Sequence, residues 1–112
     1  MPRQYSFYIY ILTNAKKTVL YTGLTNNLEL RLIEHWLHRG HPETFTGRYS
    51  VYYLLFYEHH QYIDEAIDRE NEIKGWTRKK KCALINSFNP EWTFLNKELL
   101  GEWPPKQVPN RF

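Results

Sequence analysis

The strongest constraint on the fold is an alternation of side chains near the start of the chain. In an extended strand, residues 5–12 carry Tyr5, Phe7, Ile9 and Ile11 on one face and Ser6, Tyr8, Tyr10 and Leu12 on the other. Residues 18–23 also have strand character, with Val19 and Tyr21 on a shared face. The polar link between the two strands is so short that it favours an antiparallel hairpin. The hairpin is therefore expected to present several tyrosines.

The length of 112 residues suits one domain. We expect a domain over residues 1–100 and a proline-rich tail over residues 101–112. The single cysteine, Cys82, excludes an intrachain disulfide and fits a reducing compartment. No apolar run is long enough to span a bilayer, and the first residues do not resemble a signal peptide, so no membrane association and a cytoplasmic location are expected.

Two features of the composition bear on function. The net charge of +3 and the sequence pI of about 9.0 are compatible with a phosphate-bearing partner but do not establish one. Aromatic residues make up 17% of the chain and include nine tyrosines, more than a core of this size requires. Because a phenol has a polar tip, several of the tyrosine hydroxyls must find partners or take part in chemistry.

A helix is predicted after the hairpin. Asn26 and Glu29 have the spacing of a capping box, and Gly40 ends the pattern. Between them the apolar residues at helical intervals are Leu28, Leu32 and Trp36. The other side of this helix carries Arg31, His35 and His38, spaced by four and three residues, so that these three side chains can converge on one object.

Residues 51–58 form a nearly continuous apolar and aromatic run, which is expected to be the best-buried strand. A second helix is predicted over residues 62–74, with Gly75 as its end. Its apolar stripe is Ile63, Ala66, Ile67, Glu70 and Ile73. A carboxylate in such a stripe loses solvation unless a cation or hydrogen-bond donors meet it. Glu70 therefore needs a partner, which in the simplest alternative is Arg69 or Lys74.

A third helix is predicted to begin at Thr77, with a first turn made of Arg78, Lys79, Lys80 and Lys81. Cations at this end oppose the helix dipole, so stability alone does not explain them. A phosphate ligand would, although a solvated basic face is the alternative. Together the elements predict an α+β fold in the order ββαβαα, with a small three-stranded, mostly antiparallel sheet flanked by helices.

The segments Tyr8-Ile9-Tyr10 and Tyr21-Thr22-Gly23 resemble the paired motifs of the GIY-YIG nucleases. The next helix adds Leu28, Arg31, Leu32, Glu34 and His35, and the later one adds residues 65–74. The likeness covers about residues 5–92. It is nearest to small stand-alone bacterial proteins related to the nuclease domain of excinuclease C.

This resemblance implies a role for each matching residue. Tyr21 would be the general base or would position water, and Tyr10 would be the second tyrosine of the site. Arg31 would stabilise phosphoryl charge, and Glu70 would be the carboxylate ligand of Mg²⁺ or Mn²⁺. His35 matches a histidine found in some members.

The family pattern also leaves some positions open. The late asparagine of the family site would be Asn86 or Asn89. Tyr8 replaces the glycine of the first motif, and Leu24 stands where excinuclease-type domains have a lysine. The residues expected to contact substrate are Tyr8, Arg78, Lys79, Lys80, Asn86 and Asn89. A phenol titrates near pH ~10, so Tyr21 can act as a base only with positive charge nearby, from the metal, Arg31 or His35.

The function predicted on these grounds is metal-dependent cleavage of DNA, by nicking or at irregular structure, in repair or processing. The sequence does not decide between DNA and RNA, and a protein partner for targeting is compatible with so small a domain. One alternative is a nucleic-acid-binding module of the same fold that does not cut. A second is a protein-interaction domain that uses its aromatic surface. A zinc site built on His35 and His38 lacks a firm third ligand.

Overall fold

The computed structural model describes residues 6–106, so Tyr5 and residues 107–112 of the predicted tail lie outside the described part. Three strands form one antiparallel sheet in the spatial order β2-β1-β3. The strands are β1 (Phe7–Thr13), β2 (Leu20–Thr25) and β3 (Tyr53–His60). The antiparallel pairing of β1 with β2 confirms the predicted hairpin, and it places Tyr10 opposite Gly23.

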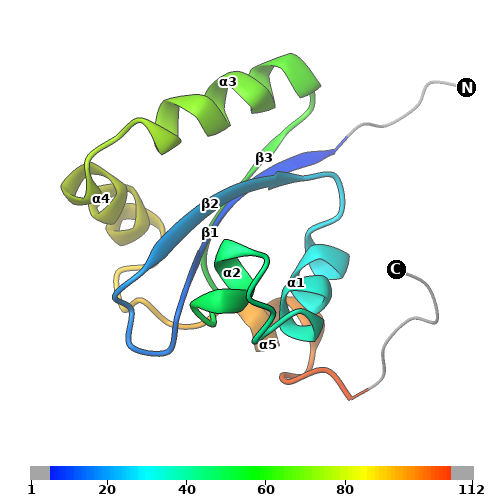
Figure 1. Cartoon of the computed structure of the whole chain (residues 1–112). Helices are drawn as coiled ribbons and strands as arrows, with labels where there is room; N and C mark the ends of the chain where they lie inside the picture. Colours follow the sequence, from blue (N-terminus) through cyan, green and yellow to red (C-terminus); the bar gives the residue numbers. More distant parts are fainter. Residues whose placement is uncertain (1–5, 107–112) are drawn as a thin grey trace, which may run out of the picture.

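Helices cover both faces of this sheet, which confirms the α+β class (Figure 1). They are α1 (Leu28–Leu37), α2 (Phe45–Arg48), α3 (Ile63–Lys74), α4 (Arg78–Phe88) and α5 (Asn96–Leu100). Helices α3 and α4 lie on one face, and α1, α2 and α5 lie on the other. The predicted order holds for the longer elements, and the short helices α2 and α5 are additional.

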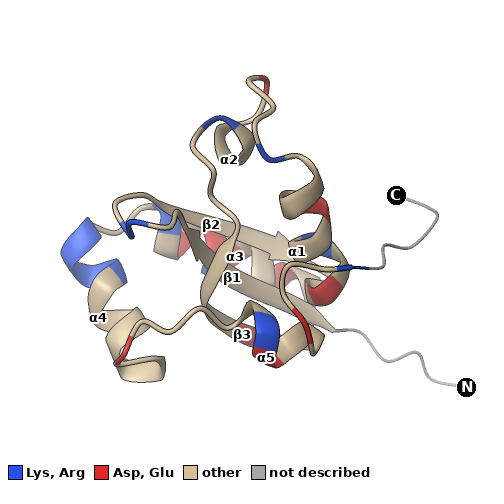
Figure 2. Cartoon of the chain, turned by 90° about the horizontal axis from the view of Figure 1, so that it is seen from below, with Lys and Arg blue, Asp and Glu red and all other residues tan. Residues whose placement is uncertain are grey.

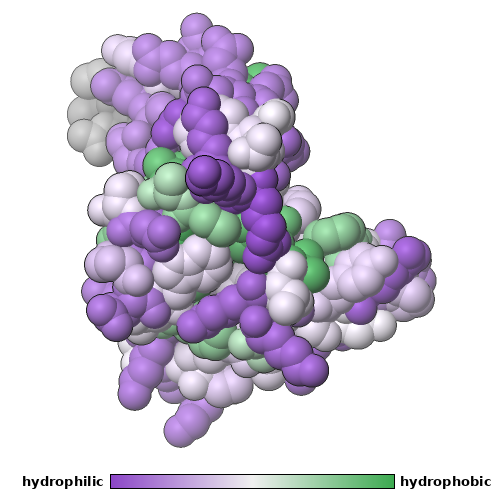
Figure 3. Space-filling model, turned by 90° about the vertical axis from the view of Figure 1, so that its left-hand side faces the viewer, coloured by the Kyte–Doolittle hydropathy of each residue, from purple (hydrophilic) through white to green (hydrophobic). Residues whose placement is uncertain are grey.

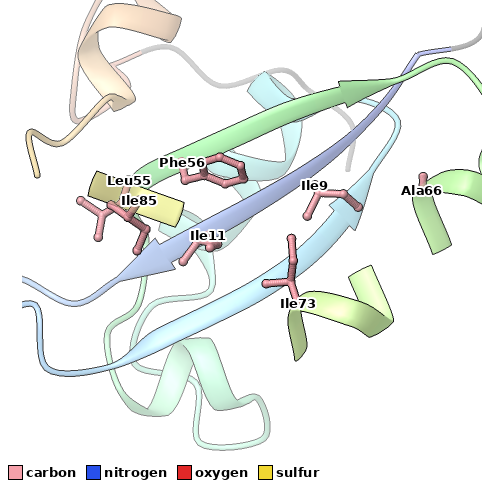
Figure 4. Close-up of a cluster of buried hydrophobic side chains, with 7 residues drawn as sticks. All are labelled: Ile9, Ile11, Leu55, Phe56, Ala66, Ile73 and Ile85. Carbon is pink, nitrogen blue, oxygen red and sulfur yellow. The ribbon is translucent and has the colours of Figure 1, made fainter. Parts of the chain in front are cut away.

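The alternation of β1 divides the core into two layers. Ile9 and Ile11 point into the layer beneath α3 and α4, where Ala66, Ile73 and Ile85 meet them (Figure 4). The opposite layer contains Tyr10, Leu12, Leu28, Leu32, Val51 and Leu54. Because a strand sends successive side chains to opposite faces, this arrangement fixes Tyr10 on the α1 side of the sheet.

The prediction that the third strand is the best-buried one was wrong. Strand β1 lies in the centre of the sheet, and five of its seven residues are buried. Strand β3 begins at Tyr53, two residues later than predicted, and lies at one edge. An apolar run indicates that both faces of a strand are covered. Whether the strand lies in the centre or at the edge of the sheet depends on pairing with residues far away in the sequence.

The helix ends follow local chemistry. Helix α1 is capped by Asn27, whose side chain accepts a hydrogen bond from the main-chain N–H of Leu30, and not by Asn26 as the spacing had predicted. Thr77 caps α4 through the main-chain N–H of Lys80, as predicted, and α3 ends at Gly75. None of the helices within residues 6–106 is long and apolar enough to cross a membrane.

The first residues of the predicted tail pack against the domain. The Trp103 ring lies 5.4 Å from that of Trp36 and 6.3 Å from that of Tyr52, measured between ring centroids. The described part of the tail therefore contacts the α1 side of the molecule.

Candidate active site

A small pocket of about 170 Å³ opens beside the hairpin on the α1 side of the sheet. Its lining comes from β2, from α1 with its C-cap residue, and from the first residues of α2 with its N-cap residue. The lining residues are Tyr21, Arg31, His35, His38, Thr44, Phe45 and Thr46. Consecutive elements of the chain thus meet at one place, and three of the residues that the sequence singled out, Tyr21, Arg31 and His35, line it together.

Tyr10 does not line this pocket but contacts two residues that do, Tyr21 and His35. Its side chain is only 1% exposed, and its hydroxyl lies 3.0 Å from Nε2 of His35. Burial raises the pKa of Tyr10 to about 12, although a hydrogen bond from Arg31 and the charge of that guanidinium act in the opposite direction. Tyr10 is therefore a neutral phenol over the whole physiological range, and it can donate a hydrogen bond but cannot act as a base.

His35 is the second buried group of the site, with 4% of its surface exposed. Burial, together with the smaller effects of the charges on Arg31 and His38, lowers its pKa from 6.5 to about 3. The expectation that His35 could supply positive charge was wrong, because an imidazole with this pKa is neutral at physiological pH. The reason is that the ring is closed off from water beside a guanidinium that is already charged.

The hydrogen bonds around His35 form a chain through both ring nitrogens. Nε2 of His35 lies 3.0 Å from the Tyr10 hydroxyl, and Nδ1 lies 3.2 Å from Oγ1 of Thr46. Each hydroxyl can donate or accept, so the chain accommodates a neutral ring with its proton on either nitrogen. Thr46 is itself buried. The chain fixes the orientation of the His35 ring and the position of the Tyr10 hydroxyl.

Arg31 lies at the mouth of the pocket, with 36% of its side chain exposed. Burial lowers the pKa of Arg31, but interactions with Tyr10 and Glu34 outweigh this effect, and the pKa lies above its usual value. Nη1 donates to Oε1 of Glu34 at 3.2 Å. The guanidinium is thus permanently charged, partly oriented and accessible to an anion.

Tyr21 joins the buried and exposed parts of the site. Its ring centroid lies 5.9 Å from that of His35 and 6.4 Å from that of Tyr10. On its outer side it stacks on Phe45, with centroids 6.2 Å apart and planes 24° apart. The half-buried Tyr21 is therefore the tyrosine of the pair that borders the pocket.

Glu70 lies on α3, behind the hairpin, and does not line the pocket itself. Its side chain is 18% exposed, and Oε2 lies 3.0 Å from Nζ of Lys74. Its negative charge contributes to the raised pKa of Tyr10, so the carboxylate lies within electrostatic range of the site. Of the two simple partners considered, Lys74 is the one found, because Arg69 pairs with Glu58 and Glu72.

The described residues fit a metal site in which one carboxylate holds a hard divalent cation. Within residues 6–106, no group of three His, Cys, Asp or Glu side chains is placed to hold an ion. A single carboxylate fits Mg²⁺ or Mn²⁺, because such ions keep several waters and share the remaining positions with substrate oxygens. Glu70 is therefore suited to a hard cation bound jointly with substrate.

The basic first turn of α4 is not part of this pocket. Arg78 donates to the main-chain oxygens of Thr18 and Lys17, at 3.1 and 3.2 Å, and braces the hairpin turn. Lys80 lies over the Trp76 ring at 4.6 Å, and Lys79 is exposed. Figures 1 and 2 place α4 and α1 at opposite sides of the molecule, and Figure 3 shows that the α4 side is mostly hydrophilic.

Three other predicted substrate contacts also have structural partners. Asn89 is buried and donates to the main-chain oxygens of Leu55 and Thr93 while accepting from the N–H of Thr93, so its amide is occupied inside the fold. Asn86 accepts from Nε1 of Trp92. Tyr8 packs edge-on against His59, with centroids 5.3 Å apart. None of the three lines the pocket.

Sequence reasoning missed the contribution of the segment around α2, where it predicted no helix or strand and no site residue. Thr44, Phe45 and Thr46 all border the pocket, and Thr46 contacts His35. The one available signal was Phe45, an aromatic residue within an otherwise polar stretch. A helix of four residues has no periodicity to detect, and its contact with α1 is not encoded by local spacing.

Comparison with known proteins agrees with this geometry. Residues 6–83 match the family described as the GIY-YIG catalytic domain. A UPF0213 protein of Clostridium perfringens is 40% identical over 92 residues, which cover 82% of this chain and 96% of the relative. A UPF0213 protein of Natronomonas pharaonis is 41% identical over 78 residues, 70% of this chain and 88% of the relative.

A solved structure supports the same relationship. The solution NMR structure of a UPF0213 protein from Bacillus halodurans has a TM-score of 0.51 and 27% sequence identity to this chain. The match covers 82% of this chain and 95% of the other. The names of these relatives state no activity.

Proposed function

This chain belongs to the family of GIY-YIG catalytic domains, and from that premise we propose that it hydrolyses phosphodiester bonds of DNA with the help of a divalent cation. The observation that carries the proposal is the meeting of Tyr21, Arg31 and His35 at one pocket, with Tyr10 hydrogen-bonded beneath it. Family membership supports a nuclease-type function. The substrate, the metal and the role of each residue are the proposal.

Arg31 neutralises the charge that builds on the phosphoryl oxygens during attack. A phosphodiester is already anionic, so the transition state needs positive charge or donors placed in advance. The guanidinium is permanently charged and reaches the pocket mouth, and Glu34 orients it from one side. The remaining N–H groups can face two oxygens of one phosphate, in the geometry for which arginine is suited.

The two tyrosines have different roles. Tyr10 stays protonated, is held by His35 and helps to orient Arg31. Tyr21 borders the pocket, so its hydroxyl can position the attacking water. As a phenolate, favoured by the positive charge of Arg31 and of a bound cation, it would accept the proton of that water. His35 and Thr46 do not contact the substrate in this scheme, because they hold the Tyr10 hydroxyl in place.

Glu70 would hold the divalent cation. The cation would replace the ammonium group of Lys74 at the Glu70 carboxylate. When bound, such an ion supplies Lewis-acid stabilisation of charge on the phosphate and the leaving oxygen.

The direct test is cleavage of supercoiled plasmid and of nicked, flapped and branched DNA, with Mg²⁺ or Mn²⁺. Arg31→Ala and Glu70→Gln should lower the rate by about 100-fold or more, which is the size of effect seen when one charge-stabilising group is removed. Tyr21→Phe should also abolish measurable cutting. Glu72→Gln is the matched control, because Glu72 lies on the same helix but is exposed and paired with Arg69.

Two outcomes would contradict the proposal. Cutting that survives Arg31→Ala and Glu70→Gln would remove the site assignment. Salt-sensitive DNA binding by the wild-type protein that leaves every substrate intact would identify a binding module instead of a nuclease.

A further inference from the structure

Two exposed aromatic side chains lie on and next to α2 and belong to neither layer of the core. Phe45 is 49% exposed and Tyr49 is 48% exposed, and their ring centroids lie 4.9 Å apart. Phe45 also stacks on Tyr21 of the pocket. A run of contacting rings therefore leads from the buried Tyr10 through Tyr21 to Phe45 and then to Tyr49 at the surface.

The segment that carries these rings is braced by close packing and by hydrogen bonds. Gly47 packs so tightly that a Cβ there would lie 2.6 Å from the main-chain oxygens of His38 and His41. Arg48 donates to the main-chain oxygen of Pro42 through Nε and Nη2, at 3.2 and 2.8 Å. Thr44 caps α2 by accepting from the N–H of Gly47 at 3.0 Å. The rings are thus held out toward solvent by a braced scaffold, so that little ordering entropy is lost on binding.

The charge around these rings favours an anionic partner. Between residues 38 and 50 the charged side chains are Arg39, Arg48 and the single acid Glu43, accompanied by His38 and His41. Figure 2 shows this segment projecting from the sheet, with basic residues on both sides of α2. Exposed aromatic rings flanked by cations are the arrangement with which proteins bind unpaired nucleotides, because every base has a face that can stack.

We propose that Phe45 and Tyr49 form a stacking surface for an unpaired nucleobase of the strand whose phosphate enters the pocket. The inference rests on the proposed function and deepens it, because it specifies a preference for DNA with unpaired nucleotides over continuous duplex. In a duplex the bases stack on one another and do not offer a free face to Phe45 and Tyr49. A single strand or a branch point does.

The test measures binding without cutting. A fluorescent oligothymidylate of about 12 nucleotides and a duplex of the same length are titrated with protein in EDTA, and fluorescence anisotropy is read. Tyr49→Ala and Phe45→Leu should each weaken single-strand binding by about 5- to 150-fold, equivalent to ~1 to 3 kcal/mol. Their effect on duplex binding should be small. Phe45→Trp should retain the wild-type affinity.

Tyr62→Ala is the matched control, because Tyr62 is also an exposed tyrosine but lies at the start of α3. It should bind both DNAs as the wild type does. Tyr49→Ala is the cleaner of the two test variants, because Tyr49 contacts Phe45 but does not line the pocket. Thermal melting of each variant establishes that it is folded.

A second measurement identifies the stacked base. One nucleotide at a time is replaced by an abasic sugar, which keeps the phosphate and removes the base. At one position in the oligonucleotide, the abasic replacement should weaken binding to the wild-type protein. The same replacement should not change binding to the double variant Phe45→Leu, Tyr49→Ala. Equal losses for single-stranded and duplex DNA would overturn the proposal, as would a Tyr49→Ala variant that behaves like Tyr62→Ala.

A wild-type dimer that Tyr49→Ala dissociates would also overturn the stacking proposal, since the surface would then contact a second copy of the chain. Failure of the nuclease proposal looks different. A protein that shows the expected stacking but leaves DNA intact with Mg²⁺ or Mn²⁺ would retain the surface and lose the activity.

Discussion

The ring of Tyr10 lies directly over Gly23, its cross-strand neighbour in the hairpin. A Cβ atom at Gly23 would fall 2.9 Å from Cε2 of Tyr10 and closer still to Cζ and the hydroxyl oxygen. The glycine that ends the second motif is therefore required by the tyrosine that ends the first. In this position the Tyr10 hydroxyl lies 3.0 Å from Nε2 of His35.

Gly23→Ala should consequently displace the Tyr10 ring and disconnect it from His35. We expect a loss of about 1 to 3 kcal/mol in the free energy of unfolding, the range for overpacking a well-filled core. Urea denaturation measures it. Gly75→Ala is the control, because a Cβ there would meet its nearest atoms at 3.6 Å. If the Tyr10 ring is the cause, Gly23→Ala should cost clearly less in a Tyr10→Ala background.

Tyr10 should also be recognisable by its titration. With a pKa raised to about 12 by burial, it should ionise well above the pH of ~10 at which a free phenol does, when the near-ultraviolet absorbance of tyrosinate is followed at rising pH. Tyr10→Phe should remove this late step. Tyr53→Phe is an informative comparison, because burial and Tyr52 also raise the pKa of Tyr53. An unchanged late step in Tyr10→Phe would show that the Tyr10 phenol is accessible to water.

Local patterns predicted the part of the site that lies on regular elements. Strand alternation placed Tyr10 on the α1 side of the sheet, and helical spacing brought Arg31 and His35 to one surface of α1. These relations are set within a few residues of chain, where side-chain direction follows from the backbone period. The short turn of the hairpin then places β2 beside β1 and brings Tyr21 to the same pocket.

The rest of the site depends on contacts that no period encodes. The hydrogen bond of Thr46 to His35 and the stacking of Phe45 on Tyr21 come from a short segment folded back over α1. Asn89 looked like a substrate ligand in the sequence, yet its amide is used to join α4 to β3. Likewise, the charge state of His35 follows from its burial, and burial at one position is a property of the whole fold.

His35 should make the protein less stable at mildly acidic pH. Its pKa is about 3 in the folded chain, against 6.5 for an imidazole exposed to water, so below pH 6.5 the unfolded chain binds one more proton. Unfolding is then favoured as pH falls. Between pH 6.5 and pH 5 the loss should be about 1.5 kcal/mol, measured by urea denaturation.

The matched variant for this measurement is His35→Gln, which cannot take up a proton. Its stability should fall less steeply over the same pH interval, and the difference between the two slopes isolates His35 from the other titrating groups. Burial raises the pKa of Glu58, but the hydrogen bonds from Arg69 and His60 and their charges together outweigh it and hold this pKa below 4.5, so Glu58 in the folded chain loses its charge below this interval. Parallel slopes for the two proteins would mean that water reaches the His35 ring.

Lys74 should compete with the divalent cation for Glu70. Its ammonium lies 3.0 Å from the carboxylate on a partly exposed side chain, so the pair contributes little and is easily displaced. Lys74→Met should tighten Mn²⁺ binding by about 1.5- to 5-fold, corresponding to the ~0.2 to 1 kcal/mol of an exposed ion pair. Titration calorimetry measures the affinity, and Lys97→Met on α5 removes the same charge at a distant exposed position. Because the effect requires the carboxylate, Glu70→Gln should abolish binding in both backgrounds. Mn²⁺ affinity that is the same in Lys74→Met and Lys97→Met, or that survives Glu70→Gln, would place the cation elsewhere.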